Sequence, residues 1–116
     1  MFKELGMLAS LMGNKTKIAE EMAKFQSTIP TITAEGTAGL GYVTVKMNGQ
    51  FTVLSVRISD EAMALNDKEM LETFIADATN QATAKVREAV ALETGKMAQA
   101  VGLPPGLLSG GLPGLG

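Results

Sequence analysis

The sequence predicts an α+β fold: a helix, a three-stranded antiparallel meander and a long helix that follow one another along the chain. Three observations predict this order. Apolar residues recur at helical spacing before residue 29, Asn48-Gly49 lies between two strand-like runs, and one apolar stripe extends from Leu71 to Ala89. A chain of 116 residues is long enough for one domain with a small core of its own.

The first predicted helix covers residues 2–28 and is interrupted by Gly13-Asn14. Either Asn14 caps a second helix, or the two pieces join through a kink. Pro30 ends the helix, because the residue before a proline is disfavoured in the helical conformation. The apolar positions at helical spacing are Leu5, Leu8, Leu11, Met12, Ile18, Met22 and Phe25.

The centre of the chain is predicted to be a meander. Its first strand is expected at Thr31–Glu35, with residues 36–39 as the turn into the second. Asn48-Gly49 favours a two-residue hairpin turn, because such a turn needs positive φ at both positions. A loop of that length would pair Met47 with Gln50. The side-chain alternation then places one set of apolar residues on a common face: Val43, Val45, Met47, Leu54, Val56 and Ile58.

The last helix carries the most regular pattern in the chain. A short helical turn is expected over residues 59–65, and Asn66 with Glu69 resembles a capping box at the start of the long helix. Phe74 and Val90 widen the apolar stripe of this helix. The stripe itself consists of Leu71, Ile75, Ala78, Ala82, Val86 and Ala89.

Composition excludes most kinds of catalytic site. The chain has no cysteine and no histidine, so disulfides, thiolate or imidazole catalysis and nearly every zinc site are ruled out. Gly36, Gly39 and Gly41 lie between two strands with no helix after them, which indicates a turn rather than a phosphate-binding loop. The acidic residues near 60–72 fit helix starts. No enzyme activity, metal, cofactor or small-molecule substrate is expected.

Charge and hydropathy define the expected surroundings of the protein. The formal net charge of −2 does not by itself indicate a nucleic-acid or membrane binder. The uncharged run at residues 5–14 is too short to span a bilayer and lacks the flanks of a secretory signal. The cytoplasm is therefore expected, without a membrane partner. Residues 102–116 form a Gly/Pro/Leu-rich tail that is expected to be mobile.

A three-stranded sheet flanked by two helices leaves much of its surface uncovered. The sheet has two open edges, and its second face mixes polar and apolar residues. The first helix is apolar on more than one side. Both features favour a two-fold homodimer that buries the first helix or a sheet face.

Three motifs resemble one known family. They are residues 39–49 (GLGYVTVKMNG), residues 67–72 (DKEMLE, followed by Asn80) and residues 103–106 (LPPG). In this order they resemble the YbaB/EbfC family of bacterial nucleoid-associated proteins. The resemblance implies one α-β-β-β-α domain over residues 1–101, an intertwined tweezer-like homodimer, and double-stranded DNA as the partner, bound with little sequence preference. The break at Gly13-Asn14 and the long tail depart from the family pattern.

In the family, the DNA contacts lie on the first helix and on the C-terminal part of the last. Lysine and arginine there would neutralise backbone phosphates. Lys17 and Lys24 are seven residues apart and so share a helix face, as do Lys85 and Lys96 at eleven. Alternatively, Glu20–Lys24 and Glu93–Lys96 are only weak surface pairs. The candidate DNA-binding residues are Lys15, Lys17, Lys24, Lys85, Arg87 and Lys96.

The sequence thus predicts a cytoplasmic, nucleoid-associated homodimer that binds duplex DNA through its phosphates and has a role in chromosome organisation and gene regulation. The alternative is a protein-interaction or scaffold module that uses Met- and Leu-rich surfaces and the C-terminal tail. RNA is a weaker candidate, because the chain has no aromatic platform for stacking single-stranded bases.

Overall fold

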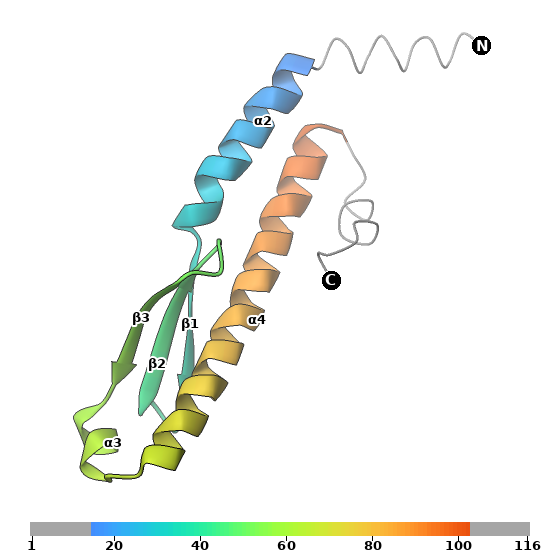
Figure 1. The fold of residues 1–116 in the computed structure, drawn as a ribbon. Helices are drawn as coiled ribbons and strands as arrows, with labels where there is room; N and C mark the ends of the chain where they lie inside the picture. The colour runs from blue at the N-terminus through green and yellow to red at the C-terminus, as the bar shows by residue number, and fades with distance from the viewer. Residues whose placement is uncertain (1–14, 103–116) are drawn as a thin grey trace, which may run out of the picture. The chain divides into compact units, whose positions relative to one another are not determined.

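The structure, a computed structural model, describes residues 15–102 (Figure 1). The predicted order of helix, three antiparallel strands and long helix is confirmed. The Gly13-Asn14 break and the tail from residue 103 onward lie outside the described residues. The elements in chain order are α2 (Lys15–Thr28), the 3-10 helix η1 (Ile29–Thr31), β1 (Thr33–Ala38), β2 (Val43–Asn48), β3 (Val53–Ile58), α3 (Asp60–Ala64) and α4 (Lys68–Ala100).

The chain divides into two compact units. One, residues 29–91, holds the sheet, α3 and the first part of α4. The other combines α2 with the chain from Leu92 onward, so that α4 contributes to both units. Within this second unit, side chains from α2 and from the end of α4, among them Phe25 and Met97, line a common hollow.

The sheet has the order β1-β2-β3, and both pairs of strands are antiparallel. The predicted hairpin register is wrong. Val43 lies opposite Ile58 and Val45 opposite Val56, where a two-residue turn would have placed Leu54 and Thr52. The shift is four residues, an even number, so the predicted grouping of side chains on faces is largely kept. The pairing of the two strands is also irregular between Lys46 and Met47, where the register shifts once more.

A longer loop than predicted connects β2 to β3. Asn48 Oδ1 accepts hydrogen bonds from the N–H groups of Gln50 and Thr52 at 2.9 and 3.1 Å. The residue with positive φ in this loop is Phe51, at 59°, and not Gly49. Gly49 is instead needed for space, because a Cβ there would lie 2.1 Å from the Ile29 carbonyl oxygen.

β1 begins two residues later than predicted and includes Gly36, which had been expected in the turn. The turn instead follows the strand, with Gly39, Leu40 and Gly41 all at positive φ. Gly36 fits the strand because α4 crosses it closely. A Cβ on Gly36 would lie 1.9 Å from the Ala78 carbonyl oxygen and 2.6 Å from the Ala82 nitrogen.

The core of this unit lies between α4 and the first two strands. The predicted helix stripe is confirmed, since its central members Ala78, Ala82 and Val86 are fully buried and Leu71, Phe74, Ile75 and Val90 pack around them. The strand residues in this core are Ala38, Val43, Val45 and Met47. β3 contributes only Ile58, which is partly buried, and lies at the sheet edge furthest from α4 (Figure 1).

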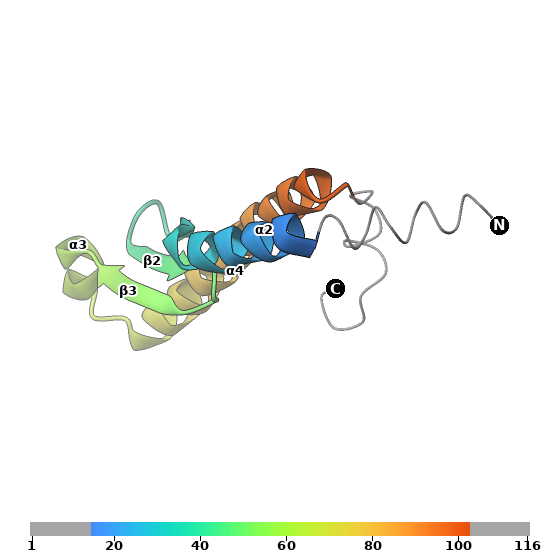
Figure 2. The same ribbon diagram turned by 90° about the horizontal axis from the view of Figure 1, so that it is seen from above.

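The segment between β3 and the long helix contains a short helix, and a side chain caps the start of each of the two helices. The expected helical turn is α3, which lies beyond the end of β3 (Figure 2) and begins with Ser59 accepting a hydrogen bond from the Ala62 N–H. The predicted cap of α4 is wrong by one residue. Asp67 Oδ1 accepts from the Met70 N–H at 3.1 Å, while Asn66 has a φ of 50°. An aspartate cap also suits the positive end of the helix dipole.

Candidate nucleic-acid interface

In the unit built from α2 and the end of α4, the cations differ in how freely they can meet a phosphate. Lys24 pairs with Glu21 at 3.5 Å, and Lys96 pairs with Glu93 at 3.2 Å. The prediction that Lys24 pairs with Glu20 is therefore wrong. Both glutamates lie within one helical turn of Lys24, and the three-residue spacing is the one used. In each pair the lysine is exposed and the glutamate partly buried, and such a surface pair is worth about 1 kcal/mol or less, so a phosphate can draw either lysine away.

Lys17 is exposed and, among the described residues, has no ion-pair or hydrogen-bond partner. Of the two α2 lysines whose side chains the structure describes, Lys17 is thus freer than Lys24. Lys15 begins the same helix, but its side chain lies outside what the structure describes.

In the unit of residues 29–91, the two predicted cations of α4 are used differently. Lys85 Nζ donates a hydrogen bond to the Glu35 carbonyl oxygen of β1 at 2.9 Å. Arg87 is exposed and has no partner among the described residues. Arg87 is therefore available to a phosphate without any rearrangement, whereas Lys85 must first break its hydrogen bond to β1.

Two further cations lie on the sheet face away from α4. Lys46 lies opposite Ser55 and Arg57 lies opposite Thr44, which places both on that face. Neither has an ion-pair partner within residues 15–102. The alternation of polar and apolar residues along these strands is visible in the sequence and could have placed both cations on this face. Glu35 lies opposite Lys46, however, and its carboxylate reduces the positive charge of the face at that point.

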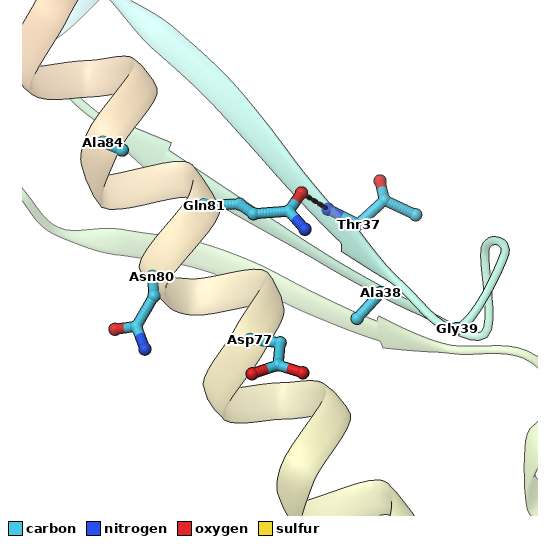
Figure 3. A pocket seen from close by; sticks show the side chains of 7 residues that line it. All are labelled: Thr37, Ala38, Gly39, Asp77, Asn80, Gln81 and Ala84. Carbon is cyan, nitrogen blue, oxygen red and sulfur yellow. Dashed lines mark hydrogen bonds between the residues drawn. The ribbon is translucent and has the colours of Figure 1, made fainter.

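An open groove lined by polar and small residues follows the outer side of β1 (Figure 3). Its lining combines residues of β1 and the turn after it with exposed residues of α4: Thr37, Ala38, Gly39, Asp77, Asn80, Gln81 and Ala84. Gln81 Oε1 reaches across to accept a hydrogen bond from the Thr37 N–H at 3.2 Å. Asp77 is the one carboxylate of the lining, and residues 15–102 contain no group of His, Cys, Asp and Glu side chains able to hold a metal ion.

The helices of the described part of the chain lack the properties of membrane spans. None from residue 15 to residue 102 combines the length and the apolarity needed to cross a bilayer. α4 has the length, but polar and charged residues recur along it.

Comparison with known proteins identifies the family. Residues 5–101 match the YbaB/EbfC DNA-binding family. Curated nucleoid-associated proteins of Bacillus thuringiensis, Bacillus cereus and Bacillus anthracis are 36% identical to the chain over 103 residues, which is 89% of this chain and 94% of theirs.

Among solved structures, the crystal structure of an uncharacterized protein, HP0035 from Helicobacter pylori, has the same fold. Its TM-score is 0.56 at 24% sequence identity, over 77% of this chain and 87% of that one. This protein therefore belongs to the YbaB/EbfC DNA-binding family, as the family match over residues 5–101 and the 36% identity to the nucleoid-associated relatives show.

Proposed function

We propose that this protein is a cytoplasmic, nucleoid-associated protein that binds duplex DNA as a homodimer, through phosphate contacts with little sequence specificity. The observation that carries the proposal is the family match over residues 5–101, together with relatives that are named nucleoid-associated proteins. A role in chromosome organisation and gene regulation follows from such binding.

Exposed cations on helices support a phosphate-based mechanism. The proposed contacts are Lys15, Lys17, Lys24, Lys85, Arg87 and Lys96. Lys17 and Arg87 are the strongest of those whose side chains the structure describes, because neither forms an ion pair with a carboxylate in residues 15–102. Binding of this kind gains affinity from released counterions and reads no base edges.

Dimerisation is supported by an apolar surface on and beside β3. Phe51, Val53, Leu54 and Val56 are each between 44% and 48% exposed, although their residue types favour burial. We call these four residues the β3 apolar surface. The helix α4 of the same chain covers β1 and β2 but leaves these side chains open. A second copy that covers them would bury the apolar area and duplicate the cations.

A salt titration tests the mechanism. If about six phosphates are neutralised, the logarithm of the binding constant for duplex DNA falls against the logarithm of salt concentration with a slope near −5. Gel shifts at several salt concentrations measure this slope. An affinity for duplex DNA that does not change with salt would contradict a phosphate-based mechanism.

Replacing Lys15, Lys17 and Arg87 by alanine tests the residues. The triple variant should bind every duplex sequence more weakly by a similar factor, because phosphate contacts carry no sequence information. A loss confined to one sequence would indicate base readout in its place.

The β3 apolar surface also suits a protein-interaction or scaffold module, which is the second candidate function. A pull-down with and without residues 102–116, run beside the gel shifts, separates the two functions. DNA binding that survives removal of the tail favours the DNA-binding function, whereas capture of one protein partner without DNA binding favours the scaffold.

A further inference from the structure

The two edges of the sheet differ in whether a further strand could pair with them. β1 and β3 are the outer strands, so each has one row of backbone groups facing away from β2. Such a row is a template for another strand, unless the protein covers it or occupies its hydrogen bonds. In this protein, side chains of α4 bond two groups of the β1 row, whereas no side chain in residues 15–102 bonds a group of the β3 row.

At the β1 edge, two side chains of α4 occupy neighbouring backbone groups. Gln81 accepts from the Thr37 N–H at 3.2 Å (Figure 3), and Lys85 donates to the Glu35 carbonyl oxygen at 2.9 Å. Outward-facing groups recur at every second residue of a strand, so Glu35 and Thr37 are consecutive outward positions. An incoming strand would have to displace both side chains.

The position of α4 makes both bonds possible. Gln81 and Lys85 are four residues apart and so lie on the same side of the helix. Gly36, between the two bonded strand residues, lets the backbone of α4 approach β1 at Ala78 and Ala82. The close helix thus brings both side chains within reach of the β1 edge.

At the β3 edge there is no equivalent. Within residues 15–102, no side chain bonds the outward backbone groups of Val53–Ile58, and the apolar side chains of this strand other than Ile58 are exposed. The two edges therefore differ in two ways: side chains of α4 bond only the β1 edge, and α4 packs beside β1 but not beside β3.

We propose that Gln81 and Lys85 close the β1 edge, so that sheets of two copies associate only through β3 and assembly stops at two. This inference rests on the homodimer of the proposed function. One usable edge per copy gives a closed two-fold pair, whereas two usable edges allow an open chain of copies.

The test is the double variant Gln81→Ala/Lys85→Ala. Alanine keeps the helix propensity high and adds no apolar bulk that would itself favour aggregation. The matched control is Asn80→Ala/Lys68→Ala, which removes one amide and one cation from exposed positions of the same helix. Light scattering after size exclusion, over a range of protein concentrations, gives the molar mass, and circular dichroism confirms folding.

We expect the parent and the control to stay at two copies, while the double variant grows beyond two with concentration. Adding Thr37→Pro should return the double variant to two copies, because proline removes the outward N–H that a new strand needs. A double variant with the same molar mass as the parent at every concentration would overturn the inference. A monomeric parent would refute the homodimer, whereas growth of the variant above its parent would still support edge closure.

Hydrogen exchange provides a second reading that requires no assembly. In the single variant Gln81→Ala, the Thr37 amide should exchange faster, on the order of fivefold to tenfold, because it loses its partner. The amide of Val45, in the central strand, should not change. Unchanged exchange at Thr37 would show that Gln81 does not protect the edge.

Discussion

The residue type at two glycine positions depends on whether another part of the backbone comes close to the position of a Cβ. Gly36 has no unusual φ, yet its hydrogen atom faces the Ala78 carbonyl oxygen and the Ala82 nitrogen of α4. Gly95, in the other unit, has nothing within 4 Å of the position of a Cβ. The same residue type is thus required at one position and dispensable at the other, which a pair of substitutions can test.

Gly36→Ala should destabilise the protein by about 3 kcal/mol, because backbone atoms of α4 cannot move aside as a flexible side chain would. Gly95→Ala, the control, should stabilise it by about 0.5–1 kcal/mol through helix propensity. Urea unfolding monitored by circular dichroism measures both free energies. Equal effects of the two substitutions would contradict the close approach of α4 to β1.

The cations allow a second prediction for single residues. Arg87→Ala should weaken binding to duplex DNA at every sequence and reduce the salt slope by about one. Lys96→Ala should have a smaller effect, because Lys96 already pairs with Glu93 at 3.2 Å and must exchange that partner for a phosphate. Gel shifts over the same salt range compare the two variants. A larger loss for Lys96→Ala would mean that ion pairing does not rank these contacts.

Among the elements, the long helix was predictable and the details of the hairpin were not. The stripe through Ala78, Ala82 and Val86 follows from spacing alone, because a buried helix face has one periodicity. The dipeptide Asn48-Gly49 indicated a two-residue turn, but Gly49 serves a close contact with Ile29 instead. That contact is set by tertiary structure, which turn preferences cannot show.

The candidate site was predictable to a similar degree. The sequence identifies which cations lie on helices, and the Lys96–Glu93 pair is confirmed because three-residue spacing is local. It gives no sign that Lys85 bonds the Glu35 carbonyl, since that contact joins residues 50 positions apart. Which cations are free therefore depends on the folded structure.

The hairpin loop itself leads to a prediction at the scale of the element. Asn48 is 8% exposed, and its Oδ1 accepts from both Gln50 and Thr52. Asn48→Ala leaves these two N–H groups without their partner, so we expect a loss of about 1–2 kcal/mol in the free energy of unfolding. The control is Asn80→Ala, at an exposed helix position, which should change stability by less than about 0.5 kcal/mol. Equal losses in urea unfolding would mean that the Asn48 side chain does not hold the loop.

For the whole molecule, the question is how an acidic protein binds a polyanion. The formal charge of one copy is −2, and a dimer carries twice that, −4. Net charge therefore opposes the approach to DNA, and binding has to depend on local groups of cations. A two-fold dimer repeats each group and so doubles the phosphates neutralised. Affinity, salt dependence and dimerisation are for this reason linked in the proposed function.

The double substitution Leu54→Asp/Val56→Asp tests that link. It places two charges in the β3 apolar surface and should raise the dissociation constant of the dimer at least about thirtyfold. In a monomer that contacts about three phosphates, the salt slope for DNA should fall from near −5 to near −3. Light scattering and gel shifts on the same samples measure both quantities. Leu92→Asp is the control, since Leu92 is 65% exposed and lies in the other unit, and it should leave the dimer intact. If Leu92→Asp separates the copies and the β3 variant does not, the dimer interface lies elsewhere.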